Sequence, residues 1–499
     1  MKLGSRGWNL ESSYTALPEA LFSFVQPRRP RAPELVFFNH DLCQRIELES
    51  SALAGPEGSE LLSGYRLPPG SKPYAQAYAG HQFGHFAILG DGRALTLGEQ
   101  VTSSGKRFDI QLKGSGKTPY SRGADGLAAL GPMLREALIS EAMHGLGIPT
   151  TRSLAVVATG DLIQRNALLP GAVLTRVASS HLRVGTFEYA AATGEPKLLS
   201  ELVRYALERH FTHAMREPNR DTAHPARILL QSVAERQADL VARWQAAGFV
   251  HGVMNTDNMT ISGETIDYGP CAFLDGHDPQ TVFSSIDQRG RYAFGQQPLI
   301  MLWNLERLAA ALLPMLEPSS PEKAKAIARE ILESAVAHYG SRWQVIMGAK
   351  LGIGEPETVP TCGGAGNNDA QLLSDLLGLM ARYKADHTNT FLRLTEEFQQ
   401  RFAAQSPFET TETESAVEYD RAVSTHNAGL EALFRDEDFG SWKSRWIQRL
   451  QNSSLSPSAI VDLLRASNPR VIPRNHAVES VLQSAVDGDF KPFARAVKI

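Results

Sequence analysis

The spacing of apolar residues changes from a strand-like to a helix-like pattern near residue 195. In residues 107–113 three apolar side chains alternate with polar ones, as in a strand with one face on the core. After residue 195 apolar positions recur every three or four residues, as on helices that bury one face. A β-rich part is therefore expected to precede a helix-rich part. Strands are predicted at 86–89, 94–97, 107–113, 153–159, 162–164 and 172–177, and helices at 127–143, 198–215, 225–247, 298–316, 323–347, 369–404, 419–435 and 457–466.

Segments rich in glycine, proline and polar residues separate these elements. Residues 1–75 show no clear period and are expected to be irregular. Gly90-Asp91-Gly92-Arg93 lies between two short apolar runs and suits the turn of a hairpin. A glycine-rich loop is expected at 114–126, and loops with short strands at 252–270. The chain is thus divided into an N-terminal extension (1–75), a β-rich lobe (76–190), a helix-rich lobe (191–400) and a helical extension (401–499).

The composition is that of a globular protein with nearly balanced charge. The 499 residues include 50 Lys and Arg against 54 Asp and Glu, a net charge of −4. This balance argues against a basic nucleic-acid binder and against an acidic tail protein. With 42% hydrophobic and 21% charged residues, disorder is not expected to be the main state.

The cysteines and apolar runs bear on the compartment. Cys43, Cys271 and Cys362 form no C-x-x-C pair, which argues against a zinc knuckle and against a disulfide-stapled secreted scaffold. No apolar signal-peptide region opens the chain, and the apolar run at 308–316 is far shorter than the roughly 20 residues of a membrane span. A cytoplasmic, monomeric protein without nucleic-acid or membrane partners is expected.

A lysine at the end of a strand and a glutamate on the next helix form the first candidate for chemistry. Lys113 ends the alternating run, and Glu136 lies on the helix that follows. Kinase-type sites hold the α- and β-phosphates with such a pair, although an unrelated surface lysine and helix glutamate would look the same. Gly116-Lys117-Thr118 resembles the end of a phosphate-binding P-loop, but Gln111 stands where that motif needs glycine, so the P-loop reading is rejected.

The most specific motif runs from His251 to Asn258 and continues at Asp267-Tyr268-Gly269. Kinase catalytic loops read H-R-D-L-x-x-x-N with D-F-G downstream, and the spacing from His to Asn is the same here. The Asn258 amide oxygen and the Asp267 carboxylate are hard ligands that suit Mg²⁺ or Mn²⁺. An Asx-rich turn is the alternative, but the order of the motifs favours the functional interpretation.

One position departs from the kinase pattern. Val253 stands where kinases have the catalytic aspartate, and its apolar side chain cannot accept a proton from a hydroxyl. Asp257 is the nearest carboxylate that could replace it. Arg176 and Arg183 could clamp phosphate oxygens, although such a pair is more often a solvated face. A metal site at His81 and His85 is improbable because no acidic partner stands beside them.

Taken together, these motifs resemble the selenoprotein O/YdiU family of kinase-fold proteins. The resemblance covers most of the chain. It is carried by 74–90 with the run Ala77-Tyr78-Ala79-Gly80-His81-Gln82-Phe83-Gly84, by Gly90–Arg93, 111–126, Glu136, 176–185 and 251–270, and also by 10–18 and 472–476.

The resemblance implies an α+β, bilobal protein-kinase-like fold with a β-rich N-lobe, a helix-rich C-lobe and extensions at both ends. It implies that ATP binds in a flipped orientation and that AMP, not phosphate, passes to Ser, Thr or Tyr hydroxyls of other proteins; this protein itself is a further candidate acceptor. ATP is then the substrate, with Mg²⁺ or Mn²⁺ as the metal. Carried over, the nucleotide contacts are Gly90, Gly92, Arg93, Lys113, Asp125, Gly126, Arg176, Arg183 and Asp267, the metal ligands are Asn258 and Asp267, and the proton acceptor is Asp257, with Glu136 paired to Lys113.

Several readings of the same residues stay open. A kinase-like phosphotransferase could use Asp257 as its base, and transfer of UMP with Mn²⁺ is not distinguished by any residue. A catalytically inactive pseudokinase scaffold is disfavoured, because a scaffold needs no metal pair. Many family members carry a selenocysteine or cysteine near the C-terminus, whereas no cysteine follows Cys362 here. Redox control is therefore left undetermined.

Overall fold

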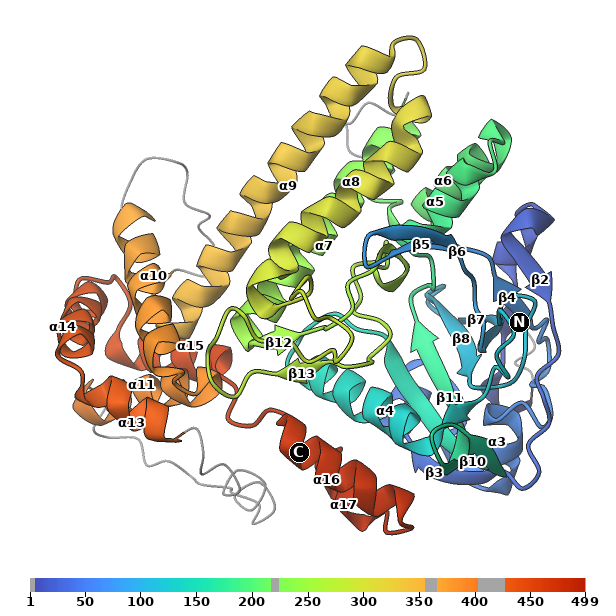
Figure 1. Cartoon of the computed structure of the whole chain (residues 1–499), viewed down its shortest axis with the longest axis horizontal. Helices are drawn as coiled ribbons and strands as arrows, with labels where there is room; N and C mark the ends of the chain where they lie inside the picture. The colour runs from blue at the N-terminus through green and yellow to red at the C-terminus, as the bar shows by residue number, and fades with distance from the viewer. Residues whose placement is uncertain (1–4, 217–223, 355–365, 403–426, 499) are drawn as a thin grey trace.

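The computed structural model describes residues 5–216, 224–354, 366–402 and 427–498 (Figure 1). It is a mixed α+β structure, with an antiparallel sheet in its N-terminal part and helices in the rest. The main path through the sheet is β2-β4-β7-β8-β11-β10-β3, with β1 paired to β7 and β9 to β11. Its strands are β1 (Leu10–Glu11), β2 (Phe22–Phe24), β3 (Glu34–Phe38), β4 (Tyr74–Gln76), β7 (Ala94–Val101), β8 (Arg107–Lys113), β9 (Ala128–Ala129), β10 (Arg152–Gln164) and β11 (Leu168–Ala178).

Helices cover both faces of this sheet. On β8, Ile110 and Leu112 pack into a core with α1 (His40–Arg45), α2 (Ser50–Leu53) and α3 (Pro56–Leu62). The opposite face, which carries Lys113, is covered by α4 (Leu130–Gly145), which packs on β10 and β11. The predicted alternation along residues 107–113 is confirmed, because the apolar and polar side chains of β8 lie on different faces.

The expectation that residues 1–75 are irregular is wrong. The segment supplies β1, β2 and β3 to the sheet, together with the helices that cover one of its faces. These strands have two to five residues, too few to show a period of two, and their partners lie far away in sequence. Pairing with the sheet, rather than local preference, makes them strands.

The predicted hairpin around Gly90–Arg93 is also wrong. The strand before it, β6 (His85–Ile88), pairs with β5 (Ala79–Gln82) in a separate two-stranded sheet. The strand after it, β7, pairs with β4 and β8. The turn therefore joins two sheets, because β7 pairs with β4 and β8 and not with β6.

Long helices follow the sheet (Figure 1). Pro225 opens α7 at its first turn, and Gly248 ends it with a left-handed φ of 72°, a backbone state that glycine adopts without strain. The helices α7, α8 and α9 pack on one another and share one core with the sheet. The elements of this middle part are α5 (Val184–Ala192), α6 (Pro196–His210), α7 (Pro225–Ala247), β12 (Phe249–Val250), η5 (Thr256–Asn258), β13 (Ala272–Phe273), α8 (Gln297–Leu316) and α9 (Pro321–Lys350).

One long helical stretch is apolar enough to be compared with a membrane span. Within the described residues, only Phe294–Leu316 has the length and mean hydropathy, 1.5, of a membrane span. Its side chains at Ile300, Leu305 and Leu312 belong to the main core. Packing between helices therefore accounts for its apolar composition.

A second helical core forms the C-terminal part. The single helix predicted at 369–404 is two helices, because Lys384 has a left-handed φ of 47° and the Asp386 side chain accepts a hydrogen bond from the backbone N–H of Asn389. The predicted helix at 419–435 is described only from Asn427. The helices are α10 (Gly366–Tyr383), α11 (His387–Phe402), α13 (Asn427–Arg435), α14 (Glu437–Gln451), α15 (Pro457–Ser467), α16 (Asn475–Val486) and α17 (Lys491–Ala496).

The last two helices return to the N-terminal part and lie beside α4 (Figure 1). Arg135 on α4 bonds to Asn475 and Glu479 on α16. Phe493 on α17 packs against Phe37 of β3, with 5.9 Å between ring centroids. The C-terminal end of the described chain thus supports the helix that carries Glu136.

Candidate active site

A cleft of about 800 Å³ brings together side chains from the sheet, α4 and the loops that follow α7. At its base, the ammonium group of Lys113 on β8 lies 2.6 Å from Glu136 Oε2 on α4. The same nitrogen donates to Asp267 Oδ1 at 2.7 Å. The predicted strand–helix pair is therefore present, and it is joined by the aspartate of the Asp-Tyr-Gly motif.

Two arginines complete the cluster around Asp267. Arg176 on β11 donates to Asp267 Oδ1 at 2.7 Å and to Glu136 Oε1 at 3.1 Å. Arg183, just before α5, donates to Asp267 Oδ2 at 2.6 Å. Burial raises the pKa of Asp267, but Lys113 and the two arginines outweigh it and hold the pKa well below its usual range. Asp267 is thus ionised at neutral pH.

The cluster is rich in cations. Lys113, Arg176 and Arg183 face the carboxylates of Glu136 and Asp267, and Arg183 also lies 4.0 Å from Asp91 Oδ1. Arg93 adds an exposed guanidinium on the wall. Such an arrangement suits an anion with several charges, of which a polyphosphate is one.

The loop after α7 places Asp257 and Asn258 in the same cleft, on the short helix η5. Burial raises the pKa of Asp257 to about 6, although Arg183 opposes the shift. Within the described structure, Asp257 Oδ1 is buried and has no hydrogen-bond partner. A buried carboxylate oxygen without a donor is costly, so a ligand that brings a hydroxyl group here would satisfy it.

The surroundings of Asp257 explain its position. A Cβ atom on Gly80 of β5 would overlap with Asp257 Oδ1, so only glycine allows this close approach. The Arg183 guanidinium donates to the Asp257 carbonyl at 2.6 Å. Val253, which stands where the kinase sequence motif has its aspartate, lines the cleft, and its carbonyl accepts a hydrogen bond from the Asn258 amide at 2.9 Å.

His251 holds this loop and takes no part in the cleft's lining. It is buried and stacks on Trp244, with 5.4 Å between ring centroids. Its Nε2 lies 2.8 Å from the carbonyl of Ile266, next to Asp267. The spacing from His251 to Asn258 therefore has a structural reason, because His251 joins the loop that carries Asn258 to the loop that carries Asp267.

The glycine-rich turns form the opposite wall. A Cβ atom on Gly90 would overlap with the ring of Tyr120, and one on Gly92 would lie 2.9 Å from the Tyr120 carbonyl. A Cβ on Gly126 would overlap with Gly116, and Gly126 has a left-handed φ of 70°. These glycines allow two loops to pack closely, which places their backbone at the cleft.

Asp125 lies at the rim and is bound by a residue that the sequence analysis missed. Its carboxylate accepts hydrogen bonds from Arg165 at 2.8 and 2.9 Å, and this pairing lowers the pKa of Asp125. Arg165 sits in the turn between β10 and β11 and also lines the cleft. Nothing in the local sequence of that turn indicates a site.

Tyr78, Asp91 and Arg122 are among the other residues that line the cleft without having been predicted as site residues. The Arg183 guanidinium lies over the Tyr78 ring, 4.8 Å from its centroid. Asp91 belongs to the Gly90–Arg93 motif, in which the resemblance implied nucleotide contacts for Gly90, Gly92 and Arg93 only. Its position between two of these residues was a readable signal that it lies at the same site.

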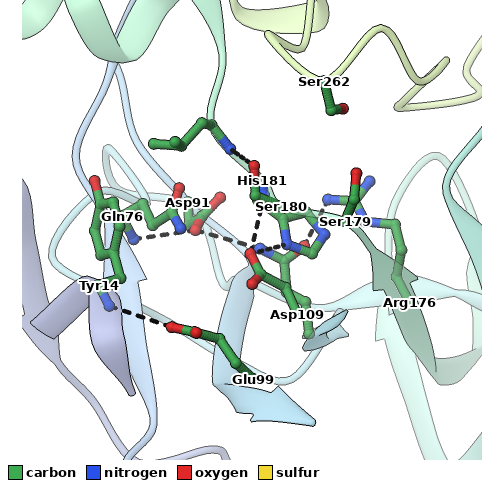
Figure 2. Close-up of polar contacts among 12 residues, drawn as sticks. Tyr14, Gln76, Asp91, Glu99, Asp109, Arg176, Ser179, Ser180, His181 and Ser262 are labelled. Atoms are coloured by element: carbon green, nitrogen blue, oxygen red, sulfur yellow. Dashed lines mark hydrogen bonds and ion pairs between the residues drawn. The ribbon is translucent and has the colours of Figure 1, made fainter. Parts of the chain in front are cut away.

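A buried polar network links Asp91 to Arg176 of the cluster (Figure 2). Asp91 accepts hydrogen bonds from the backbone N–H of Gln76 at 3.0 Å and from the Gln111 amide at 3.4 Å. Gln111 in turn accepts from Arg176 at 2.5 Å. Burial raises the pKa of Asp91 to about 6, with Arg183 acting in the opposite direction. The network fixes the orientation of Arg176, which is 1% exposed.

The predicted metal ligands are few in number and are both oxygen donors. Among the described residues, no group of three or more His, Cys, Asp or Glu side chains is arranged to hold a metal ion alone. Asn258 and Asp267 line one cleft and offer oxygen donors, which fits a hard cation that also binds phosphate oxygens of a substrate. His81 instead lies 2.6 Å from Glu188 in an ion-pair geometry.

All twelve residues predicted for the site line this one cleft. They are Gly90, Gly92, Arg93, Lys113, Asp125, Gly126, Glu136, Arg176, Arg183, Asp257, Asn258 and Asp267. Lys117, from the run that resembles the end of a P-loop, is not part of the lining. Cys271 is buried, and burial raises the pKa of its thiol to about 12, as expected for a small core residue.

Comparison with known proteins gives a consistent result over nearly the whole chain. The family model described as "Protein adenylyltransferase SelO" matches residues 7–499. The protein nucleotidyltransferase YdiU of Bacillus cytotoxicus is 52% identical over 482 residues, which cover 96% of this chain and 89% of the relative. That of Geobacillus kaustophilus is 51% identical, covering 98% and 92%. A Clostridium botulinum relative is 50% identical, covering 97% and 90%.

Proposed function

This chain belongs to the SelO family of protein adenylyltransferases, and we propose that its cleft transfers AMP from ATP to Ser, Thr or Tyr hydroxyls of proteins. One observation carries the proposal. A cluster of three cations shares a cleft with Asp257, a buried carboxylate whose Oδ1 lacks a hydrogen-bond partner in the described structure. Positively charged side chains that can bind a polyphosphate and a carboxylate that can accept a hydroxyl proton therefore lie in the same cleft.

The proposed reaction needs ATP in a flipped orientation relative to kinases. The β- and γ-phosphates would contact Lys113, Arg176 and Arg183, with the α-phosphate towards Asp257. The hydroxyl oxygen of the acceptor attacks the α-phosphorus, the bond to the β-phosphate oxygen breaks, and pyrophosphate leaves. Asp257 takes the hydroxyl proton, and the three cations stabilise the charge that develops on pyrophosphate.

The resident metal of this reaction would be held by Asn258 and Asp267. Mg²⁺ or Mn²⁺ bound there supplies additional positive charge to the phosphates. The side chains around these ligands have their own tasks. Arg183 orients Asp267 and, through the Asp257 carbonyl, the loop that carries Asp257. The Glu136 carboxylate keeps Lys113 and Arg176 in place.

We also propose that the fold is kinase-like. In support, a strand lysine pairs with a helix glutamate, and both lie across a cleft from an Asn-bearing loop and an Asp-Tyr-Gly loop. The division into two lobes with extensions at 1–75 and 401–499 stays a prediction, as does the monomeric state. A cytoplasmic location, where ATP is abundant, is part of the proposal.

The test separates AMP transfer from phosphate transfer. The purified protein is incubated with Mg²⁺ or Mn²⁺ and with ATP labelled at the α- or the γ-phosphate, and its mass is then measured. We expect an added AMP on a Ser, Thr or Tyr of the protein or of an added acceptor, and label from the α-position only. Label from the γ-position would replace this proposal with a kinase-like phosphotransferase.

The Asp257→Asn variant tests the proton acceptor. Loss of a general base lowers rates by about 10²–10⁴-fold, so we expect this loss in AMP transfer while ATP still binds. The matched control is Asp375→Asn, which makes the same change in a surface ion pair of α10. ATP binding without turnover in the wild type would instead support a pseudokinase scaffold, and a higher rate with UTP and Mn²⁺ would identify UMP as the transferred group.

A further inference from the structure

A second hollow, of about 730 Å³, lies outside the nucleotide cleft. One wall comes from the β5–β6 hairpin, with Phe83 and His85, and the other from the loop Ile286–Arg291. Ile286 lines it and is 70% exposed, so its apolar side chain is available for contact. Leu299, which is 61% exposed, directly precedes Ile300 of the lining.

The charged groups of this hollow are mainly basic. Arg289 is exposed, and within the described residues neither it nor Arg291 has a carboxylate within ion-pair distance. The Asp287 carboxylate is buried and accepts hydrogen bonds from the backbone N–H groups of Arg291 and Tyr292, at 2.9 and 2.7 Å. The guanidinium of Arg291 lies over the Trp303 ring, 4.7 Å from its centroid. The surface thus offers two guanidinium groups to an anionic partner.

The hollow is tied directly to the loop that carries Asp257. Asn255 Oδ1 accepts a hydrogen bond from the backbone N–H of Phe83 at 3.1 Å and another from the Tyr292 hydroxyl at 2.6 Å. One side chain therefore holds both walls. Asp257 is two residues further on, so its Cα lies within about 7 Å of the Cα of Asn255.

We infer that this hollow docks the polypeptide that accepts the nucleotide. Its occupant is an extended segment with an apolar side chain on Ile286 and acidic side chains on Arg289 and Arg291, next to the Ser, Thr or Tyr that reacts. Charge complementarity and the shared Asn255 anchor carry this inference, which deepens the proposed function and rests on it. The hollow then selects protein substrates by acidic residues near the modified hydroxyl.

Two fluorescent peptides test the docking surface. Both have a central Ser and one Leu, and they differ only in flanking Glu or Lys residues. Binding to the full chain is followed by fluorescence anisotropy at low ionic strength, and AMP incorporation by mass spectrometry. We expect the Glu peptide to bind at least tenfold more tightly than the Lys peptide, with the difference decreasing as salt is added.

A charge reversal makes the test specific to this surface. Arg289→Glu is expected to reduce the ratio of the two dissociation constants to about one or to invert it. The control, Arg435→Glu, changes an 81% exposed arginine on α13 and should leave the ratio as in the wild type. Equal binding of the two peptides, or a ratio that Arg289→Glu does not change, overturns the docking inference.

The two readouts separate this inference from the proposed function. A charge-dependent binding ratio without AMP on either peptide or on the enzyme would retain the docking surface and reject the transfer reaction. AMP on both peptides at equal rates, with equal binding, would retain the reaction and reject the docking surface.

Discussion

Replacing Asp267 by Asn should make the cleft bind pyrophosphate more tightly while abolishing transfer. Asp267 accepts hydrogen bonds from three buried cations at 2.6–2.7 Å. Asn has the same shape but no charge, so the net charge of the cluster becomes more positive by one unit. The variant loses a proposed metal ligand, and AMP transfer should therefore stop.

The magnitude follows from burial of the cluster. Removing one partner of a buried ion pair costs about 3–5 kcal/mol, because the other charge stays buried without compensation. Glu136 still faces Lys113 and Arg176, and the Asn oxygen still accepts a hydrogen bond, so the lower end of this range is expected. Pyrophosphate replaces the lost negative charge. A tenfold lower dissociation constant, or about 1.4 kcal/mol, is a conservative expectation for that gain.

The assay is urea unfolding of the wild type and the variant, each with and without metal-free pyrophosphate. We expect the free energy of unfolding to fall by about 3 kcal/mol without pyrophosphate, and the stabilisation by pyrophosphate to be larger in the variant. Asp375→Asn should cost less than about 1 kcal/mol, since its partner Arg445 is on the surface. Equal stability, or weaker pyrophosphate binding by Asp267→Asn, would refute the electrostatic reasoning.

Three further predictions test the structure around the site. Gly80→Ala should lower the rate of AMP transfer about 10²-fold, because the added Cβ displaces Asp257. Gly378→Ala is the control, since the space around its Cβ is open, and it should leave the rate unchanged. Steady-state kinetics measure the rates, and circular dichroism checks that both variants fold. Burial lowers the pKa of His181 to about 4. As the pH falls from about 6.5 to 4, the unfolded chain therefore binds a proton that the folded chain does not, and the free energy of unfolding of the wild type falls by about 3 kcal/mol. In urea unfolding, His181→Gln should lack most of this decrease. Burial also lowers the pKa of Lys350 to about 7. Lys350→Met should therefore raise the free energy of unfolding at pH 7 by up to about 4 kcal/mol. This gain should vanish near pH 10, because the lysine of the unfolded chain also becomes neutral there. An unchanged pH profile in either variant would contradict the corresponding pKa.

Local pattern predicted the elements that bury a regular face. The strand with Lys113 and the helices α7, α8 and α9 follow from their periods, because each extends over enough residues to repeat. The short strands β1 and β2 could not be predicted. Their pairing joins segments that lie up to about 90 residues apart, and a local period contains no information on register.

The candidate site was predictable to the extent that its residues lie in motifs. Lys113, Glu136, Asn258 and Asp267 were found from spacing and from the family resemblance. Arg165 was not, because it reaches the cleft from a turn whose sequence resembles any other turn. Asn255 was likewise missed as the anchor of two loops, since its partners Phe83 and Tyr292 come from distant segments.

The sequence by itself determined the chemistry that is available: which carboxylates, cations and glycines occur, in which order, and that Val253 cannot act as a base. Only the tertiary structure decided which of these groups contact one another. It placed three cations on Asp267, left Asp257 Oδ1 without a partner, and put a basic hollow beside the same loop. The physical reason is that charge interactions and hydrogen bonds depend on distances of about 3 Å between atoms, and these distances are set by the packing of elements far apart in the chain.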